Sequence, residues 1–234
     1  MKKILTIFAS AAIGIMAFAE ITPTDNGAKI TVDSLTTEVI VCSPSQVRVM
    51  KYYGNRPETA NCPTVRELKR VAAKGKYKID AGEYYVALNE KDGNVSFWDH
   101  EGVLIMAEQH RTASLTPLPG EKGRYTVKQD FQFGRAEVDS ILYPAAKTPV
   151  NIKGSLTEFG KTSEALPSPY VTTEKGFSIL WNSPAPGRVD DTPERPVKKA
   201  GDVTFTSDNA PAIDYYFLYP APADPFPLTG CCRK

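Results

Sequence analysis

The feature that most constrains the fold is an alternation of apolar and polar residues, at a period of two, along much of the chain. It is clearest in residues 29–33, 46–52 and 123–133. A period of two is typical of β-strands that bury one face. In the third segment, the face predicted to point into a core is made of Tyr125, Val127, Gln129, Phe131 and Phe133.

A three-stranded antiparallel meander is predicted in the first half of the chain. Runs 84–88 and 95–98 flank a turn with Asp92-Gly93, and run 103–106 follows a turn that carries His100. Asp-Gly between such runs is a strong hairpin signal, because glycine accepts the positive φ angle that the turn requires. We therefore expect His100 on the surface.

Four more runs have strand character, namely 38–41, 177–181, 202–206 and 212–219. Residues 64–73 are the one candidate for a helix, because Val65, Leu68 and Val71 fall at helical spacing and Gly75 can end it. Many short strands with at most one short helix are typical of an all-β, antiparallel β-sandwich.

Residues 1–19 are typical of a Sec signal peptide. Lys2 and Lys3 precede an apolar run, and Ala17-Phe18-Ala19 is a small-x-small cleavage site. The alternative, a membrane anchor, is disfavoured because the run is shorter than the roughly 20 residues of a bilayer span. We therefore expect an exported protein, periplasmic or extracellular, with no membrane span.

The charge balance is close to neutral, with 28 Lys and Arg residues against 27 Asp and Glu. Such a chain is not a polybasic nucleic-acid binder, so we expect no nucleic-acid partner. Cleavage after residue 19 leaves 215 of the 234 residues. That length suffices for a sandwich, but not for a sandwich and a (β/α)₈ barrel of about 250 residues.

The four cysteines are Cys42, Cys62, Cys231 and Cys232, and their spacing matches no zinc or redox motif. Export makes a Cys42–Cys62 disulfide one alternative. The other is a reduced Cys42, buried as a small apolar residue at a strand end, and the residues favour this second alternative slightly.

No catalytic motif is found. The chain has no Gly-rich phosphate loop, no G-x-S-x-G and no H-E-x-x-H. Its only histidines are His100 and His110, too few for a structural zinc cluster and poorly placed for a mutarotase-like acid–base site. We expect no metal, no other cofactor and no catalytic residue.

Five segments, in order, resemble the N-terminal domain of glycoside hydrolase family 31. Residues 30–49 are similar to its opening strands, which end in Ser-Pro-x-x-[VI]-R-V, and residues 83–108 to its next hairpins. Residues 150–154 are similar to its Asn-x-[KR]-Gly segment. Residues 167–183 and 201–219 are similar to a Pro-[FY]-containing strand and to the closing strand pair, which ends in Ile-Asp-Tyr-Tyr-Phe.

The resemblance implies a β-sandwich of the galactose-mutarotase-like type, placed before a (β/α)₈ barrel in α-glucosidases and α-xylosidases. The barrel supplies the two aspartates of a retaining mechanism. The implied partners are that barrel and, with the parent enzyme, an α-glucoside or α-xyloside oligosaccharide. Alone, the chain is expected not to hydrolyse glycosidic bonds.

The resemblance also implies a loop that helps to shape the sugar pocket, expected between Gly154 and Pro167. No family pattern matches residue for residue there. Phe159, Thr162 and Glu164 are therefore substrate-binding candidates from polarity and position alone. A plain surface loop is the alternative for each.

Two departures from the family pattern stand out. Residues 139–144 lack its Gly-[LFT]-Gly-Glu segment, and the chain stops soon after Leu228-Thr229-Gly230, which fits the step into the barrel. We therefore expect a signal peptide at 1–19, a β-sandwich domain at 20–219 and a truncated linker at 220–234, from a truncated or frame-shifted gene.

The alternative is a free-standing exported carbohydrate-binding or interaction module with the same fold, since a fold does not determine function. A sandwich that docks on a barrel is expected to expose a larger apolar patch than a free-standing module.

Overall fold

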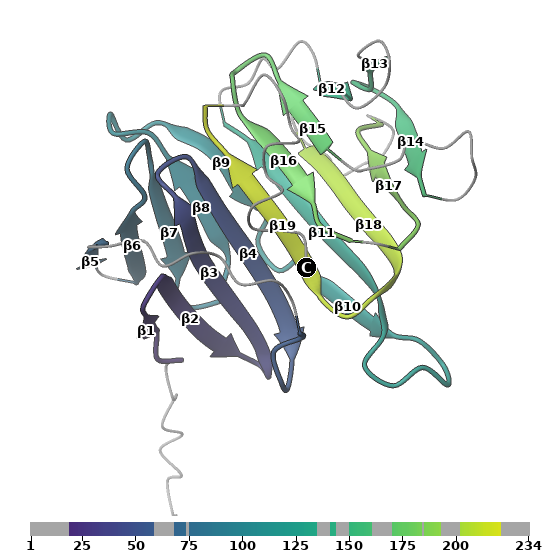
Figure 1. Ribbon diagram of the computed structural model, residues 1–234, viewed down its shortest axis with the longest axis horizontal. Coiled ribbons are helices and arrows are strands. Elements are labelled where there is room, and N and C mark those ends of the chain that lie inside the picture. Colours follow the sequence, from purple (N-terminus) through teal and green to yellow (C-terminus); the bar gives the residue numbers. More distant parts are fainter. Residues whose placement is uncertain are drawn as a thin grey trace, which may run out of the picture.

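The computed structural model describes residues 19–58, 68–73, 75–134, 141–143, 150–160, 170–183, 185–192 and 202–220. In these ranges the chain forms nineteen strands and no helix. The strands make two antiparallel sheets that pack on one another (Figure 1). This confirms the predicted all-β, antiparallel β-sandwich.

The first sheet has the strand order β1-β2-β3-β4-β19-β16-β15-β12-β13. Its strands are Thr22–Thr24 (β1), Gly27–Val32 (β2), Leu35–Ser43 (β3), Gln46–Tyr53 (β4), Ile213–Leu218 (β19), Ser178–Trp181 (β16), Tyr170–Thr173 (β15), Ile141–Tyr143 (β12) and Val150–Asn151 (β13). Strand β4 pairs with β19, with Val49 opposite Tyr215. The early and late parts of the chain therefore lie side by side in the middle of this sheet (Figure 1).

The second sheet has the order β14-β17-β18-β11-β9-β8-β7-β6-β5, and β10 pairs with β11 beside it. Its strands are Leu156–Phe159 (β14), Gly187–Asp190 (β17), Asp202–Ala210 (β18), Tyr125–Phe133 (β11), Leu104–Glu108 (β9), Val95–Trp98 (β8), Tyr85–Asn89 (β7), Lys76–Asp80 (β6), Lys69–Ala73 (β5) and Ser114–Pro117 (β10). Strands β7, β8 and β9 are the predicted meander.

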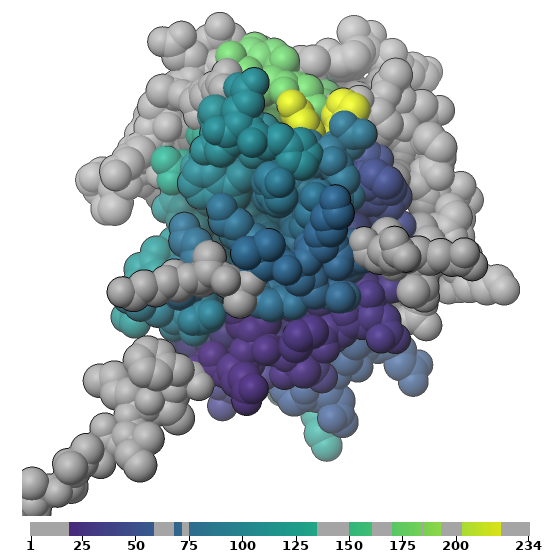
Figure 2. All heavy atoms as spheres, turned by 90° about the vertical axis from the view of Figure 1, so that its left-hand side faces the viewer, coloured from purple at the N-terminus to yellow at the C-terminus, as the bar shows by residue number. Residues whose placement is uncertain are grey.

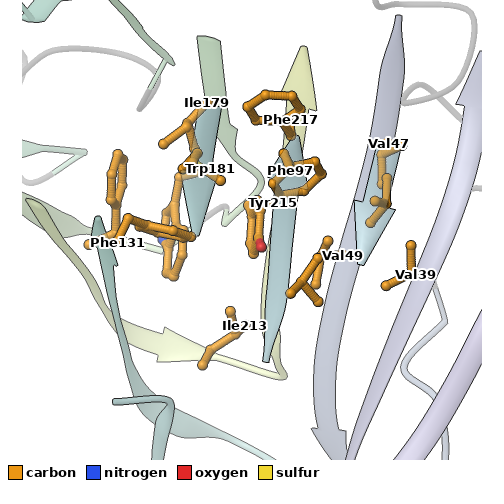
Figure 3. Packing of buried hydrophobic residues seen from close by; sticks show 14 of the residues in the cluster. Val39, Val47, Val49, Phe97, Phe131, Ile179, Trp181, Ile213, Tyr215 and Phe217 are labelled. Carbon is orange, nitrogen blue, oxygen red and sulfur yellow. The ribbon is translucent and has the colours of Figure 1, made fainter. Parts of the chain in front are cut away.

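The main core fills the space between the sheets. Trp181 of the first sheet stacks on Phe205 of the second, with ring centroids 5.3 Å apart, and Phe97 stacks on Phe217 at 3.9 Å. Figure 3 shows Trp181, Phe97 and Phe217 in this core, together with Val47 and Val49 of β4. Large buried rings contribute much of the apolar area that stabilises a sandwich.

The two sheets also meet at one edge of the molecule. Arg70 of β5 donates hydrogen bonds through Nη2 to the backbone oxygens of Thr24 and Asp25, at 2.7 Å and 3.1 Å. Figure 2 looks at this side, where the purple N-terminal strands adjoin the blue strands that follow residue 68. Arg70 therefore links β5 to the end of β1, and these are the edge strands of the two sheets on this side.

The predicted strands agree closely with the structure. In β11, Val127, Gln129, Phe131 and Phe133 are all buried, as the alternation predicts. The helix expected over 64–73 is wrong for residues 69–73, which form β5 and pair with β6. Cross-strand hydrogen bonds have overridden a weak local helical pattern there. Residues 64–67 lie outside the described residues.

The outer face of the first sheet is buried as well. A second apolar cluster on this face contains Ile40, Cys42, Met50, Tyr52, Tyr170, Ala212, Tyr216 and Leu218. Buried polar side chains, including those of Arg48 and Asp214, lie on the same face. The central strands of the first sheet are therefore covered on both faces, which is why β19 is buried at every position.

Candidate functional site

A polar concavity lies on the outer face of the second sheet, across β6, β7, β8 and β9. The pairing register sets Ala87 opposite Ser96 and Ser96 opposite Ala107. These three small side chains leave a depression that crosses the strands. We call it the Trp98 groove and define it by Lys76, Lys78, Tyr85, Ala87, Ser96, Trp98 and the turn 99–102.

Two aromatic side chains border the small residues. Tyr85 lies directly opposite Trp98, and this pair is the next one on the same face of the sheet after Ala87 and Ser96. We call the two side chains the aromatic row. The indole Nε1 of Trp98 donates a hydrogen bond to Ser96 Oγ at 2.8 Å. The ammonium group of Lys76 lies 5.5 Å from the centroid of the Trp98 ring, in cation–π range. Two contacts therefore hold the indole in place.

His100 closes the other end of the aromatic row. Its ring meets Tyr85 edge-to-face with centroids 4.7 Å apart, and its Nε2 hydrogen bonds with the backbone oxygen of Gly82 at 2.9 Å. The imidazole is exposed, which confirms the surface position predicted from the turn. It is a wall of the groove.

The groove has two hollows of about 380 Å³ and 220 Å³. Both are lined by Lys76, Ala87 and Trp98, so the indole lies at the boundary between them. Their volumes fall at or below the lower end of the range for small-molecule sites. Asn89, Asp92 and His110 line the smaller hollow.

The charges of the groove nearly balance. Lys76 and Lys78 are exposed on one side, and the turn on the other carries Asp99 and Glu101. In the smaller hollow, Asp92 is paired with His110. The groove therefore presents donors and acceptors of both signs rather than a field of one sign.

Directly beneath the groove, a buried ionic network joins the two sheets. Lys51 Nζ lies 2.8 Å from Glu108 Oε2 and donates to the backbone oxygen of Gly93 at 3.0 Å. Glu108 also accepts a hydrogen bond from the Tyr215 hydroxyl at 3.0 Å. Burial, and secondarily the Glu108 carboxylate, raise the pKa of Tyr215 well above its ordinary value. The network holds the turn of the smaller hollow against the core.

Gly93 is required at this turn. Its φ is +66°, and a Cβ atom there would lie 2.9 Å from Thr37 Oγ1. A side chain would therefore meet both backbone strain and a close contact. The Asp92-Gly93 turn predicted from the sequence is thus also the point where the meander contacts the first sheet.

The buried outer face of the first sheet carries its own ion pair. Arg48 Nη2 lies 2.6 Å from Asp214 Oδ2, and Arg48 Nε donates to Asp214 Oδ1 at 2.8 Å. Asn182 Nδ2 donates to the same carboxylate at 2.6 Å, and the guanidinium lies over the Tyr216 ring. These groups satisfy one another, so the geometry is that of a structural pair.

The substrate-binding candidates named from the sequence are not brought together by the described part of the chain. Phe159 is only 2% exposed and belongs to the main core, where its ring lies against Gly187. The expectation that it lies on a surface loop is therefore wrong. Thr162 and Glu164 lie outside the described residues, and a sugar-binding role for any of the three stays a prediction.

Cys42 takes part in a disulfide bond. The preference for a reduced, buried Cys42 is therefore wrong, although the residue is indeed buried. The other three cysteines, Cys62, Cys231 and Cys232, lie outside the described residues.

The aromatic row of the groove was not recognised as a site from the sequence. The signal was present, because Ser96 and Trp98 alternate with the core residues Val95 and Phe97 and must face outward if the strand is half buried. Alignment with Tyr85 on the neighbouring strand requires the register of the hairpin, which the Asp-Gly turn specifies.

Within the described ranges, no group of three or more His, Cys, Asp or Glu side chains is placed to hold a metal ion. No helix in the same ranges is long and apolar enough to cross a bilayer.

Comparison with known proteins gives a consistent picture of the fold. No protein-family profile matches the chain. An α-xylosidase of Saccharolobus solfataricus is 20% identical over 204 residues, which cover 80% of this chain and 26% of that enzyme. The chain therefore spans about a quarter of the length of this curated relative.

Solved structures extend the match. A GH31 α-xylosidase from a soil metagenome, complexed with xylose, superposes with a TM-score of 0.68 and 20% identity, over 88% of this chain and 33% of that one. A xylosidase from Aspergillus niger gives 0.62 and 19% identity, over 84% and 30%. A GH31 dextranase of Flavobacterium johnsoniae, complexed with glucose, gives 0.61 and 12% identity, over 86% and 25%. The chain therefore has the fold of one part of GH31 glycoside hydrolases, and its structural neighbours are GH31 α-xylosidases and related enzymes.

Proposed function

We propose that this chain is the N-terminal, non-catalytic β-sandwich domain of an exported family 31 glycoside hydrolase of the α-glucosidase or α-xylosidase type. Its role is to support a (β/α)₈ catalytic barrel and to contribute to carbohydrate binding. The observation that carries the proposal is the match of 84–88% of this chain to 30–33% of two xylosidases.

The physical basis of a supporting role is rigidity. The described strands are joined by continuous antiparallel pairing, and the central strands of the first sheet are buried on both faces. Close-packed interiors of this kind deform little, so such a unit holds a neighbouring domain in a constant geometry. Export to the periplasm or beyond is part of the proposal and rests on residues 1–19.

The test exchanges the matching region of the soil-metagenome α-xylosidase for residues 20–219 of this chain. We expect the chimera to be soluble and to hydrolyse aryl α-xylosides. The matched control, the same enzyme with that region deleted, should be inactive or insoluble. A chimera no better than the deletion would contradict the supporting role.

The non-catalytic part of the proposal has its own test. We expect no turnover of aryl α-glucosides or α-xylosides by the purified chain. Turnover that is absent from a parallel preparation of cells without the gene would contradict it.

One observation favours a second candidate, a free-standing exported carbohydrate-binding or interaction module with the same fold. Among the described residues, the large hydrophobic side chains that are exposed are Tyr53, Val71, Val150 and Leu156, one from each of four strands. A domain that docks on a barrel is expected to expose a larger contiguous apolar patch. A chain that is soluble and monodisperse by size-exclusion chromatography would favour this candidate, and concentration-dependent association would favour docking.

A further inference from the structure

We propose that the Trp98 groove is a sugar-binding site, in which the indole of Trp98 stacks against a pyranose ring of a neutral oligosaccharide. The inference deepens the proposed function, on which its choice of a carbohydrate ligand rests. It places binding on the outer face of β6 to β9, toward the opposite end of the second sheet from β14.

The first argument is the aromatic surface. A tryptophan ring has a negative face, and the C–H bonds on one side of a pyranose present weakly positive hydrogens to such a face. Trp98 is only partly buried although it lies at a paired position at the end of β8, and Ala87 and Ser96 near it are too small to fill the space around it. The ring is thus available to a flat ligand.

The second argument is preorganisation. The indole is held by its hydrogen bond to Ser96, at 2.8 Å, and both residues lie on the paired strand β8 rather than in a loop. The Lys76 ammonium, 5.5 Å from the ring centroid, is exposed, so a sugar can take its place over the ring. The turn nearby is tied to the buried Lys51. A ligand that binds here meets a surface already in position, so little conformational entropy is lost on binding.

The third argument is the polarity of the walls. Lys78 and Glu101 line the larger hollow, and the side chain of neither makes a hydrogen bond or ion pair within the described part of the chain. A free ammonium donor and a free carboxylate acceptor match the hydroxyl groups of a sugar, each of which donates and accepts. The near balance of charge disfavours a polyanion such as nucleic acid, which requires a basic surface.

The fourth argument is extent. The two hollows lie on either side of the indole and share Lys76, Ala87 and Trp98. A single sugar on Trp98 would leave the second hollow empty. The ligand that fits is therefore an oligosaccharide that passes over Trp98 and reaches both hollows.

The test titrates the purified chain with isomaltotriose, maltotriose and an α-xylosylated gluco-oligosaccharide, by calorimetry and tryptophan fluorescence. Binding of at least one is expected, with a change in emission. The chain has two tryptophans, and Trp181 is 1% exposed in the core, so Trp98 should be the source of that change. Trp98→Phe should abolish the change in emission while retaining part of the affinity.

Trp98→Ala should weaken binding at least tenfold. The matched control is Tyr53→Ala, which removes an exposed aromatic ring, 41% accessible, from the first sheet. It should bind like the wild type. Urea unfolding of both variants verifies that they remain folded.

Two results would overturn the inference. One is that none of the three oligosaccharides binds the wild type. The other is binding that Trp98→Ala leaves unchanged. If Glu164→Ala abolishes binding in that second case, the sugar binds at the loop expected from the family resemblance, and the proposed function survives without the Trp98 groove. The chimera experiment tests the proposed function independently of either result.

Discussion

The outer faces of the two sheets differ in a way that divides the molecule into a structural side and an open side. On the first sheet, Ile40, Met50 and Tyr216 are buried around the Arg48–Asp214 ion pair. On the second sheet, small and polar residues surround a partly exposed Trp98. The two faces are built from the same antiparallel pairing and differ only in which side chains point outward.

The difference follows from two kinds of strand sequence. Strand β3 contains the continuous apolar run Val39-Ile40-Val41-Cys42, and Asp214 is the one charged residue of β19, which reads Ile-Asp-Tyr-Tyr-Phe-Leu. Such runs are typical of strands buried on both sides. Strand β8 alternates strictly, with Val95 and Phe97 inward, and leaves its other face to solvent. The surface accessible to a ligand therefore lies on the side of the alternating strands.

The largest expected effect breaks the buried side. Arg48→Ala removes the partner of Asp214 and leaves a buried carboxylate without its cation, which should lower the free energy of unfolding by about 3–5 kcal/mol. Urea unfolding measures this. The double variant Arg48→Met, Asp214→Leu should recover much of the loss, since it leaves no buried charge. A decrease in the free energy of unfolding of less than about 1 kcal/mol for Arg48→Ala would show that water reaches this face in solution.

A slightly smaller effect is expected from the apolar part of the same face. Met50 is 0% exposed. Met50→Ala should cost about 2–5 kcal/mol, because it removes buried apolar area and leaves a cavity. Thermal unfolding followed by circular dichroism measures the loss. An unchanged melting temperature would place Met50 on an accessible surface.

Alkaline pH offers a milder test of the same face. Burial, followed by the nearby Glu38 carboxylate, raises the pKa of Tyr52 to about 12. The unfolded chain releases this proton near pH 10, whereas the folded chain keeps it until about pH 12. Stability from this group is therefore complete below pH 10 and is lost as the pH rises through 12.

We accordingly expect the free energy of unfolding to fall less steeply between pH 10 and 12 for Tyr52→Phe than for the wild type. Urea unfolding at several pH values in this range measures the slope. Tyr84 and Tyr215, whose burial raises their pKa values well above 10, should leave a residual slope in both proteins. Identical slopes would contradict the burial of Tyr52.

The smallest effect is expected on the open side. Lys78 is exposed on the outer face of the second sheet. Lys78→Ala should change the free energy of unfolding by no more than about 0.5 kcal/mol. If the Trp98 groove binds sugar, the same variant should weaken binding a few-fold. A large loss of stability instead would show that Lys78 has a structural role.

Much of the fold was predictable, because strands and tight turns depend on local patterns. The meander around Asp92-Gly93 and the inward face of β11 were both predicted correctly. Residues 69–73 were not, since their helical spacing competed with pairing to β6, a partner that a local pattern does not reveal. Phe159 was misplaced for a related reason, because its burial depends on Gly187, which leaves room for its ring.

The sequence by itself determined which segments are strands, where the hairpins turn, and which residues of each alternating strand face the core. These properties arise from backbone geometry and from the burial of apolar side chains within short segments. Only the tertiary structure decided that Arg48 meets Asp214 and that Lys51 meets Glu108 beneath the groove. Arg48 and Asp214 are 166 positions apart in the chain, and the order of the strands in the sheets brings such distant residues together.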